Sequence, residues 1–514
     1  MQISDHSGVC SLPRAAAFLG RKAAENRTVL LSSFLFGFLA HGFAFTNKLV
    51  NHDEVASLFT KGATVESGRF GLGLLDLIFP NYSMPWIYGI VSVALLAVAA
   101  ALLVNLFEVR SKLMQVLFAG VLLSFPSLTG TFGYMFTSSS YALSFLLACG
   151  GVWLFTNRSL WQRGLALCLM VASLSIYQSY ISLAAGLFVL YLFRQLLLGE
   201  KPGRILLQGV ADVAFLVLSL GLYFLAAKLV LKITGVSFGQ YAESSIVLRL
   251  SELPGKAMLA YATFGRFFTE SLHGLIPTYL SRLLHGLLGV FCLGLFLPWA
   301  LCRKKEALGS LLLAVLLLLL LPLAVNCMYL ITAESSIHTL VLYGFVCLYL
   351  LPLILADTLP AQSRVLRFAA EHALPLILAG IVTVNVYIAN QAYLNLHLRY
   401  ENAHAFYSAL IADLNSNPDF QEGTKLALVG TYVSPKFYEE QFADTDRITG
   451  VHGFLPDGYA RSQFMSYYIG LDVPFASDGE VAALQELAQV QAMPRYPYYG
   501  SIQTIDGMLV VKLS

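Results

Sequence analysis

The sequence predicts an α-helical protein that crosses a membrane many times, and its composition and its long apolar runs both indicate this class. Of its 514 residues, 57% are hydrophobic and only 12% are charged, whereas about a quarter of the residues in a soluble domain are charged. Apolar runs of about 18 to 25 residues recur along the chain, and about 20 helical residues cross a hydrocarbon core of about 30 Å. The formal net charge of +2 argues against nucleic acid as a partner.

About eleven transmembrane helices are predicted from these apolar runs. They span residues 28–46, 86–107, 113–130, 139–156, 164–179, 181–198, 205–231, 283–301, 307–325, 338–356 and 373–392. No small-residue cleavage site follows the first run, so we expect a retained helix rather than a signal peptide.

Basic residues in alternate connections predict the orientation of these helices. The basic connections are residues 1–27 and the loops that contain Arg110, Arg158, Lys201, Arg303 and Arg364. Short loops rich in Lys and Arg stay in the cytoplasm. We therefore expect residues 1–27 to be cytoplasmic and residues 47–85, 232–282 and 393–514 to lie outside.

The segment 393–514 lacks long apolar runs and gains polar turns. Strand-like runs at 426–429 and 507–513 predict a small α/β domain. The chain is thus expected to have a cytoplasmic segment (1–27), a transmembrane domain (28–392) and an extracytoplasmic domain (393–514).

The first outer loop contains the main catalytic candidates. Its charged and polar residues are Lys48, His52, Asp53, Glu54, Lys61 and Arg69. A carboxylate can accept a proton from an attacking hydroxyl, and a guanidinium can bind a phosphate through paired hydrogen bonds. The alternative interpretation is that Asp53 and Glu54 only cap a short helix at 54–61.

Further polar side chains lie at the outer ends of later helices. They are Tyr134, Tyr177, Gln178, Tyr180, Glu334 and His338. Tyrosines at this depth commonly anchor a helix at the interface, and outer turns are polar by default. Gln178 is harder to explain in this way, because an amide near hydrocarbon needs hydrogen-bond partners. Sugar hydroxyls or a neighbouring helix could supply them.

Several segments, taken in order, resemble the Gtr type II glucosyltransferases, bacterial inner-membrane enzymes that modify O-antigen. They are residues 51–54 (NHDE), 67–70 (SGRF), 134–138 (YMFTS), 176–180 (IYQSY), 493–497 (MPRYP) and 500–502 (GSI). The chain has Phe70 where the family is associated with a tryptophan.

This resemblance implies a GT-C-like fold and a multi-pass protein of the bacterial inner membrane. The implied reaction moves a hexose, expected to be glucose, from a polyprenyl-phosphate donor to a surface polysaccharide such as the O-antigen of lipopolysaccharide. A donor-making synthase and a donor flippase are then expected partners. One displacement at the anomeric carbon implies inversion.

The resemblance also implies roles for the polar residues. Asp53 matches the family's essential acid, with Glu54 beside it, and Arg69 is the first candidate for the donor phosphate, assisted by Lys48 or Lys61. His52 and the outer helix ends would contact sugar or acceptor. No cofactor is predicted: a divalent ion could bridge Asp53 and the phosphate, but two adjacent acids make a thin metal site.

Two other functions remain open at this point. A transporter or flippase of lipid-linked sugars would place its polar residues near the bilayer midplane, whereas the candidates here lie at outer helix ends. A polymerase or ligase of surface glycans would use similar lipid-linked substrates. The chain has no phosphate-binding Gly-rich loop that ends in Lys-Ser/Thr, which argues against direct use of ATP.

Overall fold

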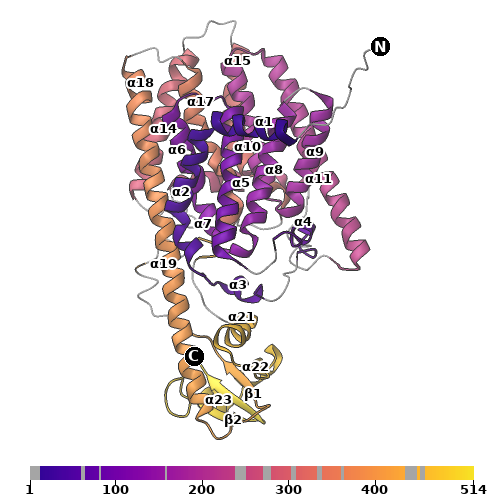
Figure 1. Ribbon diagram of the computed structural model, residues 1–514, viewed down its shortest axis with the longest axis vertical. Coiled ribbons are helices and arrows are strands. Elements are labelled where there is room, and N and C mark those ends of the chain that lie inside the picture. Colours follow the sequence, from indigo (N-terminus) through magenta and orange to yellow (C-terminus); the bar gives the residue numbers. More distant parts are fainter. Residues whose placement is uncertain are drawn as a thin grey trace.

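The computed structural model describes residues 12–58, 64–79, 83–156, 159–237, 250–269, 279–301, 308–332, 338–359, 364–433, 441, 448–451 and 458–514. Over these ranges the chain is mostly helical, and its long helices run side by side in a bundle (Figure 1). Two predicted site residues, Lys61 and Glu334, lie outside the described residues.

Each of the eleven predicted transmembrane helices has a helical counterpart. These are α2 (Arg27–Thr46), α5 (Pro85–Leu106), α6 (Lys112–Ser124) with α7 (Pro126–Gly133), α8 (Met135–Thr156), α9 (Leu160–Ile176), α10 (Tyr180–Leu197), α11 (Pro202–Thr234), α14 (Tyr279–Leu301), α15 (Leu308–Val325), η4 (Thr339–Tyr349) with α17 (Leu350–Thr358), and α19 (Leu374–Asn415). Among the described residues, nine helices are long and apolar enough to cross a membrane. The pair α6 and α7, bent by 43°, gives a tenth, and α9 is an apolar helix of 17 residues. The chain is therefore a polytopic helical membrane protein.

The bend between α6 and α7 has a local cause. Pro126 is the first residue of α7, and a proline has no backbone N–H and clashes with the preceding turn. The predicted single helix 113–130 is therefore broken at Phe125, which has extended backbone angles.

The helices differ in how much of their surface the protein covers. In α10 83% of the apolar segment is buried, but in α11 and α14 only 22% is. The exposed side chains of α11 are apolar, as at Val213 and Leu229. Apolar side chains need no partner in hydrocarbon, so the uncovered surfaces of α11 and α14 are suited to contact with lipid, whereas α10 lies in the core.

Shorter helices occupy the connections. They are α1 (Leu12–Glu25), α3 (His52–Ala56), α4 (Phe70–Leu75), η1 (Leu250–Glu252), α13 (Leu253–Thr269), α16 (Met328–Ile331), α18 (Arg364–Phe368) and η5 (Ala369–Ala373). Helix α13 is held against the C-terminal end of α15, because Asn326 donates a 3.0 Å hydrogen bond to the carbonyl of Ala260.

The C-terminal part contains a small sheet with short helices. Its elements are β1 (Lys425–Val429), α21 (Gly458–Phe464), η6 (Met465–Ile469), α22 (Asp478–Gln485), α23 (Ala488–Ala492), β2 (Ile502–Ile505) and β3 (Met508–Lys512). The strand order is β1-β3-β2, with β1 parallel and β2 antiparallel to β3. Strands β1 and β3 coincide with the two predicted strand-like runs, and β2 was not predicted. Helix α19 continues to Asn415, so the predicted boundary at 392–393 falls inside one helix.

The sheet lies at the same end of the bundle as α3 and α4 (Figure 1). Helix α21 packs against α3, which brings the C-terminal part next to the first outer loop. The loop that contains the candidate catalytic residues therefore lies between the bundle and this part of the chain.

Candidate active site

Asn51 begins the short helix α3 that carries both acids. Its side-chain oxygen accepts hydrogen bonds from the backbone N–H groups of Asp53, at 3.0 Å, and Glu54, at 2.9 Å. This is the geometry of a helix N-cap. The interpretation that Asp53 and Glu54 themselves cap the helix is therefore wrong.

Glu54 is buried and fully engaged. Only 1% of its surface is exposed, and its carboxylate accepts hydrogen bonds from Ser83 Oγ at 2.6 Å and from the backbone N–H of Phe136 at 3.1 Å. The ammonium of Lys48 forms an ion pair with it and also contacts Ser83. A buried carboxylate needs such partners, so Glu54 joins α3 to the start of α8.

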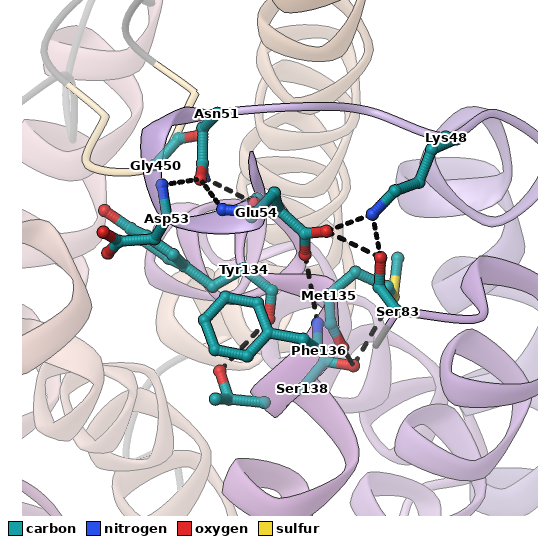
Figure 2. Close-up of polar contacts among 12 residues, drawn as sticks. Lys48, Asn51, Asp53, Glu54, Ser83, Tyr134, Met135, Phe136, Ser138 and Gly450 are labelled. Atoms are coloured by element: carbon teal, nitrogen blue, oxygen red, sulfur yellow. Dashed lines mark hydrogen bonds and ion pairs between the residues drawn. The ribbon is translucent and has the colours of Figure 1, made fainter. Parts of the chain in front are cut away.

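Asp53 points away from this buried cluster (Figure 2). Its side chain is 43% exposed, and the imidazole Nε2 of His52 lies 3.5 Å from Asp53 Oδ1. Of the two adjacent acids, Asp53 is thus the one that a ligand arriving from outside can reach.

Arg69 is held by two tyrosines. Its Nη1 donates a 3.0 Å hydrogen bond to the hydroxyl of Tyr141, and its guanidinium carbon lies 5.4 Å from the ring centre of Tyr177. The two tyrosine rings stack with centres 4.2 Å apart. A cation over an aromatic face is stabilised electrostatically, so this pair orients the guanidinium.

Gln178 fixes the backbone next to Arg69. Its amide nitrogen donates to the carbonyl of Ser67 at 3.3 Å and to the hydroxyl of Tyr223 at 2.7 Å. The Tyr223 hydroxyl in turn donates to the carbonyl of Gly68 at 3.0 Å, and Phe70 stacks on the Tyr223 ring. The partners of Gln178 are therefore a neighbouring helix and the outer loop.

The start of α8 connects the acid cluster to Arg69. The N–H of Phe136 binds Glu54, and the hydroxyl of Tyr141 binds Arg69. Five residues of helix rise about 7.5 Å. Asp53 and Arg69 are 16 positions apart in the loop. The contact of Glu54, next to Asp53, and the contact of Arg69 therefore fix both parts of the loop to the same two turns of α8.

The C-terminal part touches this site directly. The side-chain amide of Asn51 donates to the carbonyls of Gly133, at 2.7 Å, and Gly450, at 2.9 Å. Gly450 has a φ of 89°, and a Cβ added there would lie 2.5 Å from the ring of Tyr134. Only glycine fits this close approach. Gly450 therefore allows the C-terminal part to pack directly against Asn51, the cap of α3.

Tyr468 brings an aromatic ring of the C-terminal part close to Glu54. Its hydroxyl is buried and has no hydrogen-bond partner within the described chain, and its ring stacks on Phe464 with centres 5.5 Å apart. Burial raises the pKa of Tyr468, and the negative charge of Glu54 raises it further. The hydroxyl of Tyr468 is therefore a neutral hydrogen-bonding group within electrostatic range of Glu54.

The other predicted residues lie differently. Tyr134 is buried, with its ring 6.4 Å from that of His52. Tyr180 is buried between Phe145 and Tyr177, where it packs the helix bundle. His338 is exposed at the start of η4, and among the described residues no contact joins it to Asp53 or Arg69.

Several residues of the site were not predicted from the sequence. They are the cap Asn51, the partners Ser83, Tyr141 and Tyr223, and the C-terminal Gly450 and Tyr468. An Asn just before a helix whose first turn holds two acids is an N-cap signal, so the role of Asn51 could have been predicted. Tyr223 and Gly450 are far from the loop in sequence, and no local pattern indicates that they fold against it.

Comparison with known proteins identifies the family. The model of the family described as "Glucosyl transferase GtrII" matches residues 42–349, a range that contains Lys48, Asp53, Glu54 and Arg69 and ends before Gly450 and Tyr468. No curated protein and no solved structure matched the chain. Because the family match covers more than half of the 514 residues, this membrane protein belongs to the GtrII glucosyltransferase family.

Proposed function

We propose that this protein transfers a hexose, glucose by the family's description, from a polyprenyl-phosphate donor to a surface polysaccharide such as O-antigen. The observation that carries the proposal is that one loop holds an accessible carboxylate, Asp53, and an oriented guanidinium, Arg69, and that this loop is bound to the start of α8. A base for the acceptor and a cation for the leaving phosphate are the two groups that such a transfer needs.

In the proposed reaction, an acceptor hydroxyl attacks the anomeric carbon from the face opposite the phosphate. Asp53 accepts the hydroxyl proton as the new C–O bond forms. The bond from the anomeric carbon to the phosphate oxygen breaks, and its electron pair leaves with the polyprenyl phosphate. One displacement inverts the anomeric centre, through a transition state with oxocarbenium character.

Arg69 stabilises the negative charge on the leaving phosphate. A guanidinium has five N–H donors, and the bond to Tyr141 uses one of them. Hydrogen-bond donors that are already oriented need not move when negative charge develops on the leaving group, so they stabilise that charge without a free-energy cost for reorganisation. Lys48 forms an ion pair with Glu54, so we assign it the role of holding the acid pair in place. Arg69 is then the residue assigned to the donor phosphate.

Glu54 is a positioning residue in this scheme. Its carboxylate oxygens are occupied by Ser83, Lys48 and the N–H of Phe136, which leaves it poorly placed to take a substrate proton. By fixing α3 to α8 it sets the distance between Asp53 and Arg69.

The site is proposed to face the periplasm, with the N-terminus in the cytoplasm. The basic connections predict this orientation, and the contact between Asn51 and Gly450 places the C-terminal part on the same side as Asp53. A fluorescent reporter that matures only in the cytoplasm should stay dark after Ser514 and be bright after Glu200. A bright fusion after Ser514 would reverse the orientation.

Mass analysis of surface polysaccharide tests the reaction itself. Cells that express the chain should gain one hexose per repeat unit, and cells that express the Asp53→Asn variant at the same level should not. A change in polysaccharide length without added hexose would indicate a polymerase or ligase. Movement of the lipid-linked sugar from one leaflet of a liposome membrane to the other, without sugar transfer, would indicate a flippase.

A further inference from the structure

A cavity with several charged groups in its wall lies at the end of the bundle away from Asp53. It has a volume of about 270 Å³ and is bounded by the ends of α8, α9, α10 and α11. Its charged and polar lining residues are Arg163, Tyr191, Gln195, Glu200, Arg204 and Gln208. Thr156, also in its wall, is the last residue of α8, whose first turn lies at the candidate active site, about 30 Å away along the helix.

One donor in this cavity lacks an acceptor. Arg163 Nε is buried and has no hydrogen-bond partner within the described residues, although the guanidinium carbon lies 5.2 Å from the ring centre of Phe155. An unsatisfied buried donor is costly. Arg163 also lines the cavity, so its guanidinium is the group that a ligand oxygen there would bind.

The charges around the cavity are balanced. Arg204 Nη1 binds the carboxylate of Glu200 at 3.1 and 3.3 Å. Behind the lining, Gln208 donates a 2.7 Å hydrogen bond to Asp212, which is 3% exposed and whose Oδ2 has no partner in the described chain. Two guanidinium groups and two carboxylates fit a ligand with charges of both signs better than a purely anionic one.

The cavity has an exposed apolar residue in its wall, and two more are exposed at the start of α9. Leu207 lines the cavity and is 73% exposed, and Leu160 and Trp161 are exposed at the start of α9. A tryptophan and basic residues at helix ends mark the headgroup level of a membrane. The ligand is therefore expected to have a polar head in the cavity and apolar chains along α11.

We propose that this cavity binds the headgroup of a phospholipid that carries a phosphate diester and a primary ammonium, as phosphatidylethanolamine does. The phosphate bonds to Arg163 and Arg204, since guanidinium and phosphate pair through two hydrogen bonds. The ammonium donates to Glu200. The site is separate from the transfer site and needs no covalent chemistry.

Lipid retention by the unaltered full chain tests the ligand. Protein in mild detergent is mixed with equal amounts of phosphatidylethanolamine, phosphatidylcholine and phosphatidylglycerol, and bound lipid is counted by native mass spectrometry. One phosphatidylethanolamine should be retained, about fivefold more often than either competitor. Equal retention of phosphatidylcholine would exclude the contact between the lipid ammonium and Glu200. A preference for phosphatidylglycerol would mean that the cavity selects a purely anionic headgroup, which contradicts the proposal. If inorganic phosphate alone raises the melting temperature as much as the lipid does, the ligand is a soluble phosphate and the proposal fails.

Substitutions then locate the bound lipid. Arg163→Gln should lower phosphatidylethanolamine retention about fivefold, and Glu200→Gln should remove its advantage over phosphatidylcholine. The matched control is Arg110→Gln, which removes a charge of the same sign from the same end of the bundle at a side chain that is 86% exposed. If Arg163→Gln and Arg110→Gln lose phosphatidylethanolamine retention equally, the lipid is attracted to the charged surface in general. That result would overturn the cavity as the binding site.

Discussion

The Asp53→Asn protein should insert and fold normally but transfer sugar about 10² to 10⁴ times more slowly, the usual contribution of a general base. Asparagine keeps the size of the side chain but cannot accept the proton. The change does not remove the helix cap, because Asn51 supplies it. Initial rates with purified protein in liposomes, using a radiolabelled polyprenyl-phosphate hexose, measure the effect.

Glu54→Gln is the matched control, because it makes the same chemical change at the adjacent acid. Glutamine has one acceptor oxygen, which can keep the hydrogen bond from the N–H of Phe136, and its NH2 group can donate to the hydroxyl of Ser83. The ion pair with Lys48 is lost. Removing one charge of a buried ion pair typically lowers the free energy of unfolding by about 3 to 5 kcal/mol. Because the hydrogen bonds are retained, we expect a loss of stability near or below the lower figure. We therefore expect a lower melting temperature with measurable residual transfer.

The two variants together decide which acid is the base. If Asp53→Asn transfers at the parental rate while folded Glu54→Gln is inactive, the base is Glu54 and the assignment fails by one residue. Parental rates for both variants would make the acid pair structural, and the proposed mechanism would have to be abandoned.

The helices were predictable from the sequence because the bilayer imposes a simple length rule. Each apolar run of about 20 residues had to become a helix, since backbone groups in hydrocarbon must bond within their own segment. The end of α19 was not predictable in this way. Beyond residue 392 the helix continues to Asn415 in a sequence that is no longer continuously apolar.

The loop motifs indicated candidate residues but not the contacts that distinguish them from one another. Asp53 and Glu54 are adjacent and chemically alike, and only tertiary structure distinguishes the exposed acid from the buried one. The difference arises from Ser83 and Phe136, which approach Glu54 from other parts of the chain. Likewise, Gln178 was expected to need partners, but nothing near it in sequence indicated Tyr223.

Replacing Arg69 should give the second large effect, and the size should depend on the replacement. Arg69→Ala removes every donor aimed at the leaving phosphate, so kcat/KM should fall about 10²- to 10³-fold, as when one preorganised transition-state donor is lost. Arg69→Lys keeps the charge but loses the planar fork that pairs with phosphate, so we expect an intermediate loss. The rates are measured at varied donor concentration to separate kcat from KM.

Tyr141→Phe tests whether the orientation of Arg69 matters as well as its charge. The hydroxyl that accepts from Arg69 Nη1 is removed, while the stack of residue 141 on Tyr177 can persist. If Arg69 acts as a preoriented donor, this variant should lose about tenfold or less in kcat/KM, since one neutral hydrogen bond contributes about 0.5 to 1.5 kcal/mol. Arg69→Ala combined with Tyr141→Phe should then be no slower than Arg69→Ala alone, because the tyrosine acts only through the arginine. Independent, additive losses would mean that Tyr141 contacts the substrate itself, and unchanged kinetics in both Arg69 variants would remove the arginine from the site.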